Sequence, residues 1–598
     1  MAKELPKRSE VPVEFTWKLE DMYVDAAAWE ADLKTFQEMA QKLSSYEGTV
    51  TKSARNLLDV LSLNAALGEK ADLLLGYAAR LSDQDTKDTA HQAMLQRAYG
   101  VYADAASSLA FIDPEILETE DALLEDYYKE LPDLSLYCKQ IEEIKRLKAH
   151  MLPAAMEKLI AMTAEMSENP SRTYSVFNNA EMVFPEVVDE NGESVRITHG
   201  RFVALEESAD RRVRKETFEK LYNTYKQYEN TLASIYSGHV KQLIFHAKAR
   251  NYTSTLEAAV DANNVSPKVY QNLVATVDQN LDKMHRYVSL RKKLLGVDEL
   301  HMYDIYTPII SGAARNIPFE EAKETVLKAL APLGEDYLSV VRKGFNERWI
   351  DIYENQGKRS GAYSAGSYAT HPYVLLNYSG SLDSMFTLAH EMGHAMHSYL
   401  SNSTQPYIYS NYKIFVAEVA STCNEVLLME YLLKNTTDKK ERAYLLNHYM
   451  DSFKGTVYRQ TMFAEYEMIT NQMAERGESL TAEALDKVYH DLNCKYYGPD
   501  MVSDPEIAVE WARIPHFYYN FYVYQYATGY TSAVAIARNI LKNGAPAVEA
   551  YKRFLSGGCS QSPVELLKIA GVNLETPQPI QDALDVFGDI VKEMEALV

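Results

Sequence analysis

The sequence Ser381–His397, SLDSMFTLAHEMGHAMH, contains the pattern His390-Glu391-x-x-His394. A helix turns about 100° per residue, so two histidines four residues apart project from one face and can bind one metal ion. Glu391 lies on the flank of that face, where it can act as a general base. The opposite side is apolar and carries Met385, Ala389, Met392 and Met396. The stretch therefore predicts a half-buried helix that holds a metal ion over a cavity.

Two further features favour a metal site over histidines that are simply buried in a core. Gly393 costs a helix about 1 kcal/mol relative to Ala and lies near the metal face, which indicates that another backbone passes close by. His397 shares that face with His390 and His394, although the chain has only 14 histidines in 598 residues. We therefore interpret the pattern as a metal site.

Composition limits the possible partners. Hydrophobic residues make up 46% and charged residues 24%, which is typical of a globular protein with a large core. The net charge of −23 argues against nucleic acid and against anionic membrane surfaces, because both repel an acidic protein. Small or peptide-like partners remain possible.

The N-terminus and the cysteines bear on location. The first residues, MAKELPKRSEVPVEF, contain no apolar core of signal-peptide length, and no run of about 18 apolar residues follows. Cys138, Cys423, Cys494 and Cys559 are scattered, so neither a disulfide framework nor a cysteine zinc site is indicated. We expect a cytoplasmic protein with reduced cysteines.

The periodicity predicts a mainly α fold. Residues 17–182 have a helical pattern, and residues 184–197 then read as a hairpin with Asn191-Gly192 in a type I′ turn. We take this hairpin as the boundary between an N-terminal helical lobe, residues 1–198, and a catalytic domain, residues 199–598. A surface hairpin within one continuous domain is the alternative.

A small sheet is expected just before the metal helix. Residues 359–378, RSGAYSAGSYATHPYVLLNY, alternate small residues with β-branched and aromatic ones, and predict two short strands. Such a sheet beside a metal site offers an edge that can pair with an extended peptide. A purely structural hairpin is the alternative.

The helix expected at residues 411–433 supplies a third ligand. Its circumference is apolar except for a stripe with Glu418 and Glu425, and a buried carboxylate is costly unless it is paired or bound to metal. Glu418 is therefore the expected third ligand, and Glu425 can accept the free ring N–H of a ligand histidine. Leu400 excludes the metzincin pattern, which needs a histidine there. Asn424 breaks the apolar pattern of this helix, and the sequence offers no explanation for it.

A second aromatic cluster lies in residues 513–530, RIPHFYYNFYVYQYATGY. Tyrosines on rigid elements supply hydroxyl donors, which an oxyanion forming at the metal requires. We select His516, Tyr522 and Tyr526 for this role. Other pocket residues, expected to contact substrate, are His397, Tyr519 and Tyr530.

Three segments together resemble a known family: residues 390–397 (HEMGHAMH), residues 417–425 (AEVASTCNE), and residues 514–519 (IPHFYY) followed by 522–524 (YVY). They look like oligoendopeptidase F, within the thimet-oligopeptidase group of zinc peptidases, and the likeness extends over the whole chain. The resemblance implies two helical lobes that enclose a deep substrate channel admitting oligopeptides.

The resemblance also implies residue roles. One Zn²⁺ per chain would be held by His390, His394 and Glu418, with Glu391 as general base on a zinc-bound water. His516 and a tyrosine from residues 522–530 would stabilise the transition state, and Gly361, Ala362 and Tyr363 would lie on the substrate-binding strand. One departure concerns the tyrosines after His516, whose spacing matches the thimet branch only after a one-residue shift.

The expected function is that of a metalloendopeptidase that hydrolyses internal bonds of short oligopeptides. Two other functions stay open. A peptide-binding protein without catalysis would retain the helical clamp alone. A metallocarboxypeptidase would need a cation near the site to hold the terminal carboxylate of its substrate.

Overall fold

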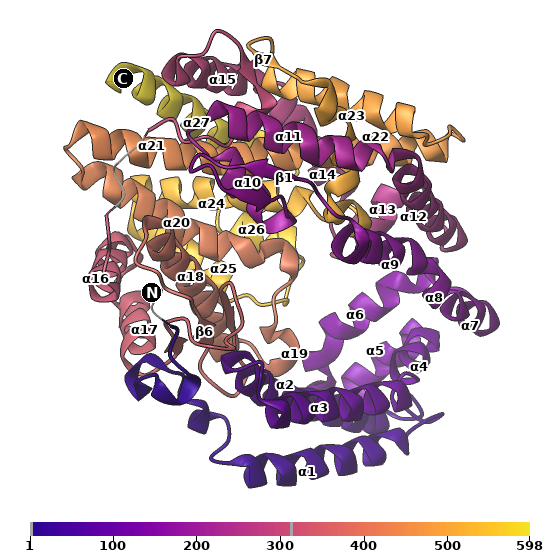
Figure 1. The fold of residues 1–598 in the computed structure, drawn as a ribbon. Helices are drawn as coiled ribbons and strands as arrows, with labels where there is room; N and C mark the ends of the chain where they lie inside the picture. Colours follow the sequence, from indigo (N-terminus) through magenta and orange to yellow (C-terminus); the bar gives the residue numbers. More distant parts are fainter. Residues whose placement is uncertain (1–3, 311–314) are drawn as a thin grey trace. The chain divides into compact units, whose positions relative to one another are not determined.

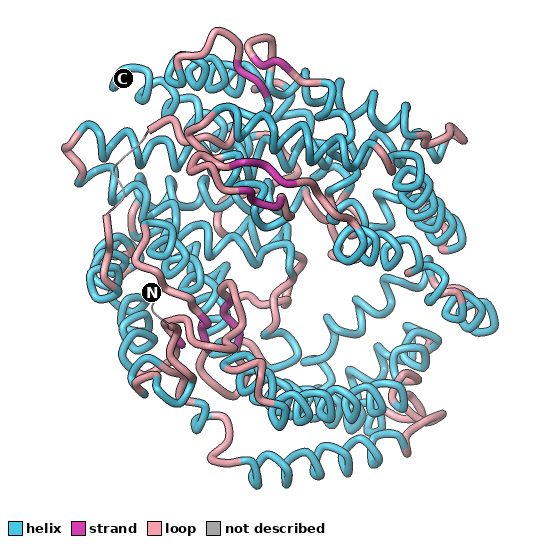
Figure 2. The backbone as a smooth tube through the Cα atoms, in the orientation of Figure 1, coloured by secondary structure: helices cyan, strands magenta, loops and turns pink. Residues whose placement is uncertain are grey.

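The computed structural model describes residues 4–310 and 315–598, and the chain forms two compact units. Unit 1 contains residues 4–149, 315–431 and 536–571; unit 2 contains residues 150–310, 432–535 and 572–598. Helices dominate both units, with a few short strands (Figure 2). The mainly α fold expected from the sequence is confirmed, while the boundary at residue 198 and the substrate channel remain predictions.

Unit 1 holds the N-terminal helices and the helices around the predicted metal site (Figure 1). Its helices are α1 (Ala26–Ser44), α2 (Ala54–Gln84), α3 (Thr89–Ser108), α4 (Ile112–Glu118), α5 (Asp121–Glu130), α6 (Cys138–Arg146), α16 (Phe319–Ala329), α17 (Glu335–Asn346), α18 (Leu382–Thr404), α19 (Tyr407–Ser410), α25 (Ala545–Leu555) and α26 (Pro563–Ile569). Two further helices, α20 (Ile414–Asn435) and α24 (Tyr524–Asn543), contribute residues to both units.

One three-stranded sheet lies in unit 1, with the order β4-β6-β5. Its strands are β4 (Ile350–Asp351), β5 (Tyr363–Ala365) and β6 (Tyr373–Leu375). β6 pairs in parallel with β4 and antiparallel with β5, and both β5 and β6 pack against α18. The two strands predicted before the metal helix are confirmed, and β4 is an addition that comes from a more distant segment of the chain.

Unit 2 is also helical. Its helices are α7 (Ala154–Met162), α8 (Ala164–Ser167), α9 (Asn169–Val176), α10 (His199–Glu206), α11 (Arg211–Lys226), α12 (Glu229–Ala249), α13 (Thr255–Asp261), α14 (Pro267–Asp278), α15 (Leu281–Leu295), α21 (Lys439–Phe453), α22 (Arg459–Glu475), α23 (Ala482–Tyr497) and α27 (Gln578–Leu597). Its strands are β1 (Glu186–Val188), β2 (Ser194–Arg196), β3 (Leu300–His301) and β7 (Met501–Val502). β1 pairs antiparallel with β2, and β3 pairs in parallel with β7.

Short 3₁₀ and π segments connect these helices. They are η1 (Arg8–Glu10), η2 (Val13–Phe15), η3 (Leu19–Asp21), η4 (Pro132–Tyr137), η5 (Leu147–His150), η6 (Phe177–Glu181), η7 (Met302–Asp304), η8 (Ala331–Leu333), η9 (Lys454–Tyr458), η10 (Pro505–Arg513) and η11 (Pro515–Tyr518). None of the helices in the described ranges is both long and apolar enough to cross a lipid bilayer. The cytoplasmic location stays a prediction.

The hairpin predicted at residues 184–197 is present, but its turn differs from the prediction. Val187 pairs with Val195. Five residues connect the strands, and the carboxylate of Asp189 accepts hydrogen bonds from the backbone N–H groups of Asn191 and Glu193 at 2.9 and 2.8 Å. A type I′ turn needs a positive φ at Asn191, which is not observed. The type I′ prediction was therefore wrong, because the Asp189 side chain organises the loop.

Candidate active site

The helix α18 presents the two predicted histidines. Its N-cap is Ser381, whose side chain accepts a hydrogen bond from the Ser384 N–H at 3.0 Å. The apolar back of the helix, with Met385, Ala389, Met392 and Met396, is buried as expected. The helix is therefore fixed from one side, and His390 and His394 project from the other.

Gly393 allows a second helix to cross close to the first. A Cβ added there would lie 2.5 Å from the Cα of Ser421 and 2.6 Å from the carbonyl oxygen of Ala420, both on α20. Real side chains cannot tolerate such contacts. The close backbone approach predicted from this glycine is confirmed, and it brings Glu418 of α20 toward the histidines.

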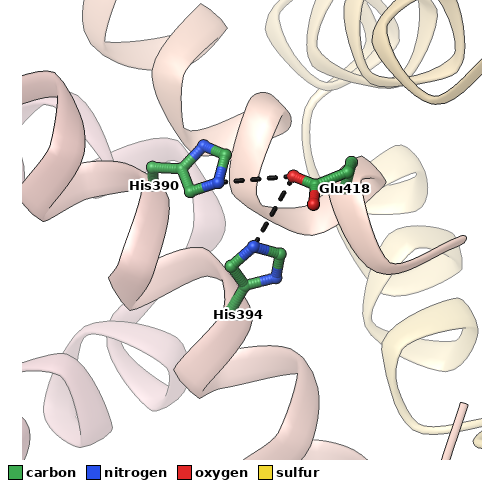
Figure 3. A group of neighbouring side chains, drawn as sticks. All are labelled: His390, His394 and Glu418. Carbon is green, nitrogen blue, oxygen red and sulfur yellow. Dashed lines mark ion pairs between the residues drawn. The ribbon is translucent and has the colours of Figure 1, made fainter. Parts of the chain in front are cut away.

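The three predicted ligands come together. The Nε2 atoms of His390 and His394 lie 3.3 and 3.6 Å from Oε2 of Glu418, which faces them from α20 (Figure 3). The three donor atoms lie within 4.8 Å of one another. Two imidazole nitrogens and one carboxylate oxygen form a donor set that suits a catalytic metal ion. This cluster can hold a metal.

Glu425 contacts the other side of His390. Its Oε1 lies 2.8 Å from Nδ1 of the ring. Burial alone would disfavour the charged imidazole, but Glu418 and Glu425 together hold the pKa of His390 well above its usual value. The surroundings therefore favour a positive charge at this position. Burial alone would raise the pKa of Glu418, but hydrogen bonds from His390 and His394 hold it below its usual value.

Glu391 is buried beside this cluster, with 5% of its surface exposed. Burial raises the pKa of its carboxyl group, and the two neighbouring histidines partly oppose the rise. Within the described part of the chain, Oε2 has no hydrogen-bond partner. A carboxylate oxygen without a protein partner is free to exchange a proton with a water molecule or a substrate.

Asn424, which the sequence pattern left unexplained, joins three helices. Its Nδ2 donates to the carbonyl oxygen of Ala389 at 3.0 Å, and its Oδ1 accepts from the Tyr337 hydroxyl at 3.3 Å. The side chain is fully buried. It therefore connects α20 to α18 and α17 directly behind the metal residues. An amide on an otherwise apolar helix face was the only sequence signal for this role.

His397 lies in the core next to Tyr412, a residue that sequence reasoning missed. The two rings stack with centroids 3.6 Å apart and an interplanar angle of 2°, and 1% of His397 is exposed. Burial lowers the pKa of His397 to about 3, so its ring is neutral. The Tyr412 hydroxyl lies 3.1 Å from Oγ of Ser398. This geometry gives His397 a packing role under Tyr412, and its predicted contact with substrate stays a prediction.

The segment predicted to bind substrate forms the edge of the sheet. Tyr363 begins β5, and its hydroxyl donates to Oδ2 of Asp83 at 2.6 Å. Gly361 has φ +82°, and its carbonyl accepts from Nδ2 of Asn377 at 2.8 Å. Ala362 lies between these two anchored residues. Among the described residues, β5 pairs only with β6, so its other edge has no strand beside it.

A cavity of about 1000 Å³ lies in unit 1 beside β5, and its described lining residues do not include Gly361, Ala362 or Tyr363. Its lining includes Ser364 and Ala365 of β5, Tyr412, and Ala417, the residue that precedes Glu418. The charged side chains among its lining residues are Asp72 and Asp113. The cavity is therefore peptide-sized, and the lining residues that are described include no lysine or arginine.

The second predicted cluster is formed within unit 2. The His516 ring lies 5.6 Å from that of Tyr519 and 6.0 Å from that of Tyr526. Tyr522 and Tyr526 are in contact at 5.3 Å, although α24 begins only at Tyr524 and Tyr522 precedes it.

The members of this cluster differ in exposure. Burial lowers the pKa of His516. Tyr519 is 54% exposed, whereas Tyr530 is buried against Phe453 at 5.0 Å. Tyr519 and Tyr526 thus lie beside His516 and Tyr522 contacts Tyr526, while Tyr530 packs into the core.

Comparisons with known proteins identify the family of the chain. The sequence matches the family model described as Peptidase family M3 over residues 204–586, and the model described as Oligopeptidase F over residues 115–184. It is 48% identical over 597 residues to Oligopeptidase PepF of Bacillus subtilis, covering 100% of this chain and 89% of that protein. It is 40% identical to an Oligoendopeptidase F of Lactococcus lactis subsp. cremoris, covering 99% of this chain and 98% of the other.

Solved structures give the same result. The crystal structure of oligoendopeptidase-F from Enterococcus faecium is 39% identical with a TM-score of 0.75, over 95% of this chain and 98% of that one. A crystal structure from Chlamydophila abortus has a TM-score of 0.94 at 34% identity, covering 100% of both chains. The full-length matches and the His-His-Glu cluster lead to one conclusion: the chain belongs to the oligoendopeptidase F group of peptidase family M3.

Proposed function

We propose that the protein is a zinc-dependent endopeptidase that hydrolyses internal peptide bonds of short oligopeptides. The observation that carries this proposal is the cluster of His390, His394 and Glu418. Glu391 lies on the same helix as the two histidines, and its Oε2 has no hydrogen-bond partner among the described residues. The names of the relatives, which describe oligopeptidases, support the same substrate class.

The donor set fits Zn²⁺. Structural zinc sites have four protein ligands, whereas catalytic sites have three and leave a position open. His390, His394 and Glu418 would supply the three, and Glu425 would orient His390 through its Nδ1 hydrogen bond. When bound, Zn²⁺ acts as a Lewis acid that polarises the substrate carbonyl and acidifies water.

The chain's own residues would perform the proton transfers. Glu391, with a raised pKa, takes a proton from the attacking water and delivers it to the departing amine. His516 and a tyrosine from the cluster of Tyr522 and Tyr526 donate hydrogen bonds to the oxyanion as it forms. One such donor contributes about 10²- to 10³-fold in rate.

The substrate would lie along β5. An extended peptide can add to the unpaired edge of a strand through main-chain hydrogen bonds, and Ser364 and Ala365 of β5 line the cavity. A metallocarboxypeptidase would need a cation for the terminal carboxylate. The charged residues among the described lining of this cavity are Asp72 and Asp113, and a map of the cleavage products decides between the two activities.

Peptidase assays on the purified protein test this proposal. An internally quenched peptide of about ten residues should be cleaved, a chelator should stop cleavage, and Zn²⁺ should restore it. Mass spectrometry should show internal cuts; a ladder of products shortened from the C-terminus would instead indicate a carboxypeptidase.

Variants separate catalysis from binding. Glu391→Gln should retain one zinc per chain yet lose turnover. Glu430→Gln is the matched control, since Glu430 is a glutamate of α20 that pairs with Arg538 at 3.5 Å. Near wild-type cleavage by Glu391→Gln would contradict its role as the base. Tight peptide binding without cleavage by the wild type would indicate a binding protein.

A further inference from the structure

The loop between His516 and Tyr526 has an unusual backbone. It connects η11 with α24 and contains two consecutive residues other than glycine with positive φ, Asn520 at +51° and Phe521 at +54°. Asparagine tolerates this left-handed conformation, but a bulky residue such as phenylalanine rarely adopts it. Such a backbone persists only where the surrounding structure holds it.

A buried carboxyl group holds this loop. The backbone N–H of Phe521 donates to Oε1 of Glu467 at 2.6 Å. Glu467 lies on α22 and is 1% exposed, while Phe521 is 2% exposed. Among the described residues, the second oxygen of Glu467 has no hydrogen-bond partner. The bond to Phe521 is therefore the polar contact through which this buried side chain acts.

The aromatic ring of Tyr270 supports the loop next to Glu467. The rings of Phe521 and Tyr524 both pack on Tyr270, with centroids 5.7 and 4.9 Å away. The Tyr270 hydroxyl donates to the carbonyl of Ala464 at 2.6 Å, one helical turn before Glu467. Tyr270 is thus tied to α22, the helix that carries Glu467, and the two side chains hold the loop together.

The same helix supports the other end of the loop. Phe517, next to His516, packs on Phe463 and Tyr466 of α22 at 5.5 and 4.9 Å. α22 therefore contacts the chain at Phe517, next to His516, and at Phe521, next to Tyr522.

The surroundings keep Glu467 uncharged at neutral pH. Burial raises its pKa to about 8, and the Phe521 hydrogen bond only partly opposes the rise. Burial raises the pKa of two nearby tyrosines, Tyr236 of α12 and Tyr270 of α14, and both lie close enough for a charge on Glu467 to raise their pKa further. A neutral acid can accept the Phe521 N–H without the cost of a buried charge.

We infer that Glu467 is a positioning residue: through the N–H of Phe521 it holds the strained loop that sets His516 and Tyr522 in place. The inference rests on the proposed function, in which these two groups stabilise the oxyanion. Displacing a catalytic group by about 1 Å can cost about 100-fold in rate. Glu467 therefore affects turnover although it contacts no substrate.

Steady-state kinetics with three variants test this role. Glu467→Met keeps the length of the side chain but removes the acceptor, and should lower kcat about 10- to 100-fold with KM little changed. Glu467→Gln retains an acceptor oxygen and should recover most of kcat. Thr470→Val is the matched control, because Thr470 is fully buried one turn further along α22 and bonds to Tyr236 at 2.9 Å. It should lower Tm yet leave kcat within about twofold.

Hydrogen exchange gives a second readout that does not depend on activity. Amides of residues 514–524 should exchange at least about tenfold faster in Glu467→Met than in the wild type, and at the wild-type rate in Thr470→Val. Glu467→Asp, whose shorter side chain cannot reach Phe521, replaces Glu467→Met if the latter does not fold.

Two results would overturn the inference: equal losses of kcat in Glu467→Met and Thr470→Val, or unchanged exchange in residues 514–524. Failure of the proposed function has a different signature, since the wild type itself would then cleave no peptide while the exchange difference persists.

Discussion

Oε1 of Glu425 lies 2.8 Å from Nδ1 of His390, while Nε2 of the same ring lies 3.3 Å from Glu418. When His390 is neutral, its Nδ1–H donates a hydrogen bond to Glu425, which leaves the Nε2 lone pair directed toward Glu418 and the predicted metal position. One side chain of α20 thus orients His390 of α18, and a second side chain of α20, Glu418, completes the cluster.

Removing this orientation should weaken metal binding. Glu425→Ala should reduce zinc affinity about 10- to 100-fold, because the His390 ring loses its hydrogen-bond partner. The zinc affinity of Glu425→Gln should lie between those of Glu425→Ala and the wild type. Competition with a chromophoric chelator measures the affinity. Glu430→Gln, on the same helix, should bind zinc as the wild type does; equal affinities for all four proteins would show that Glu425 has no such role.

Adding one methyl group at Gly393 should push α20 away from α18 and so displace Glu418 from the two histidines. The Cβ of Gly393→Ala would meet the backbone of Ala420 and Ser421 at 2.6 and 2.5 Å, and a backbone cannot move aside as a side chain can. We expect a loss of about 1–3 kcal/mol in stability and weaker zinc binding, since Glu418 shifts with α20.

The control for this substitution is Gly100→Ala. Gly100 lies within α3, and a Cβ there meets nothing within 4 Å. This variant should be slightly stabilised, because alanine is the better helix former. Thermal unfolding compares the two; equal stability of both variants would contradict the close crossing of α18 and α20.

Asn424→Ala should destabilise unit 1 by about 1–3 kcal/mol, because the buried hydroxyl of Tyr337 loses its Asn424 acceptor and the carbonyl of Ala389 loses the donor from α20. Asn346→Ala, at the exposed C-terminal end of α17, should change stability by less than about 0.5 kcal/mol. Denaturant unfolding measures both. A similar small effect at the two positions would mean that the amide does not connect the helices.

Glu467 should make stability depend on pH. Its pKa is about 8 in the folded protein, against an ordinary value of 4.5. The folded state keeps a proton that the unfolded chain releases above pH 4.5, so this contribution is complete at low pH and is lost as pH rises toward 8. Tyr236 and Tyr270 stay neutral throughout, since burial raises the pKa of both.

Glu467→Gln does not titrate, so its Tm should rise relative to the wild type between about pH 5 and pH 8 and gain no more above that. Thermal unfolding across this range checks the expectation. A difference in Tm that does not change with pH would show that Glu467 is already ionised in the folded protein.

The clustering of His390, His394 and Glu418 could be predicted because it depends on local helical periodicity. A period of 3.6 residues alone places His390 and His394 on one face, and it also places Glu418 and Glu425 on one stripe of the next helix. Gly393 even indicated how closely the two helices cross. The turn at Asn191 could not be predicted in the same way, because the Asp189 carboxylate competes with the usual preference of the pair Asn-Gly.

By itself, the sequence determined the mainly α class and the family, and it predicted the cluster of His390, His394 and Glu418, since each depends on helical periodicity or on residues within short segments of the chain. Only the tertiary structure decided how Asn424 connects three helices, why His397 stacks in the core, and how Glu467 holds the strained loop at Phe521. These roles depend on contacts between residues far apart in sequence, and burial, which sets their energies, exists only once the helices have packed.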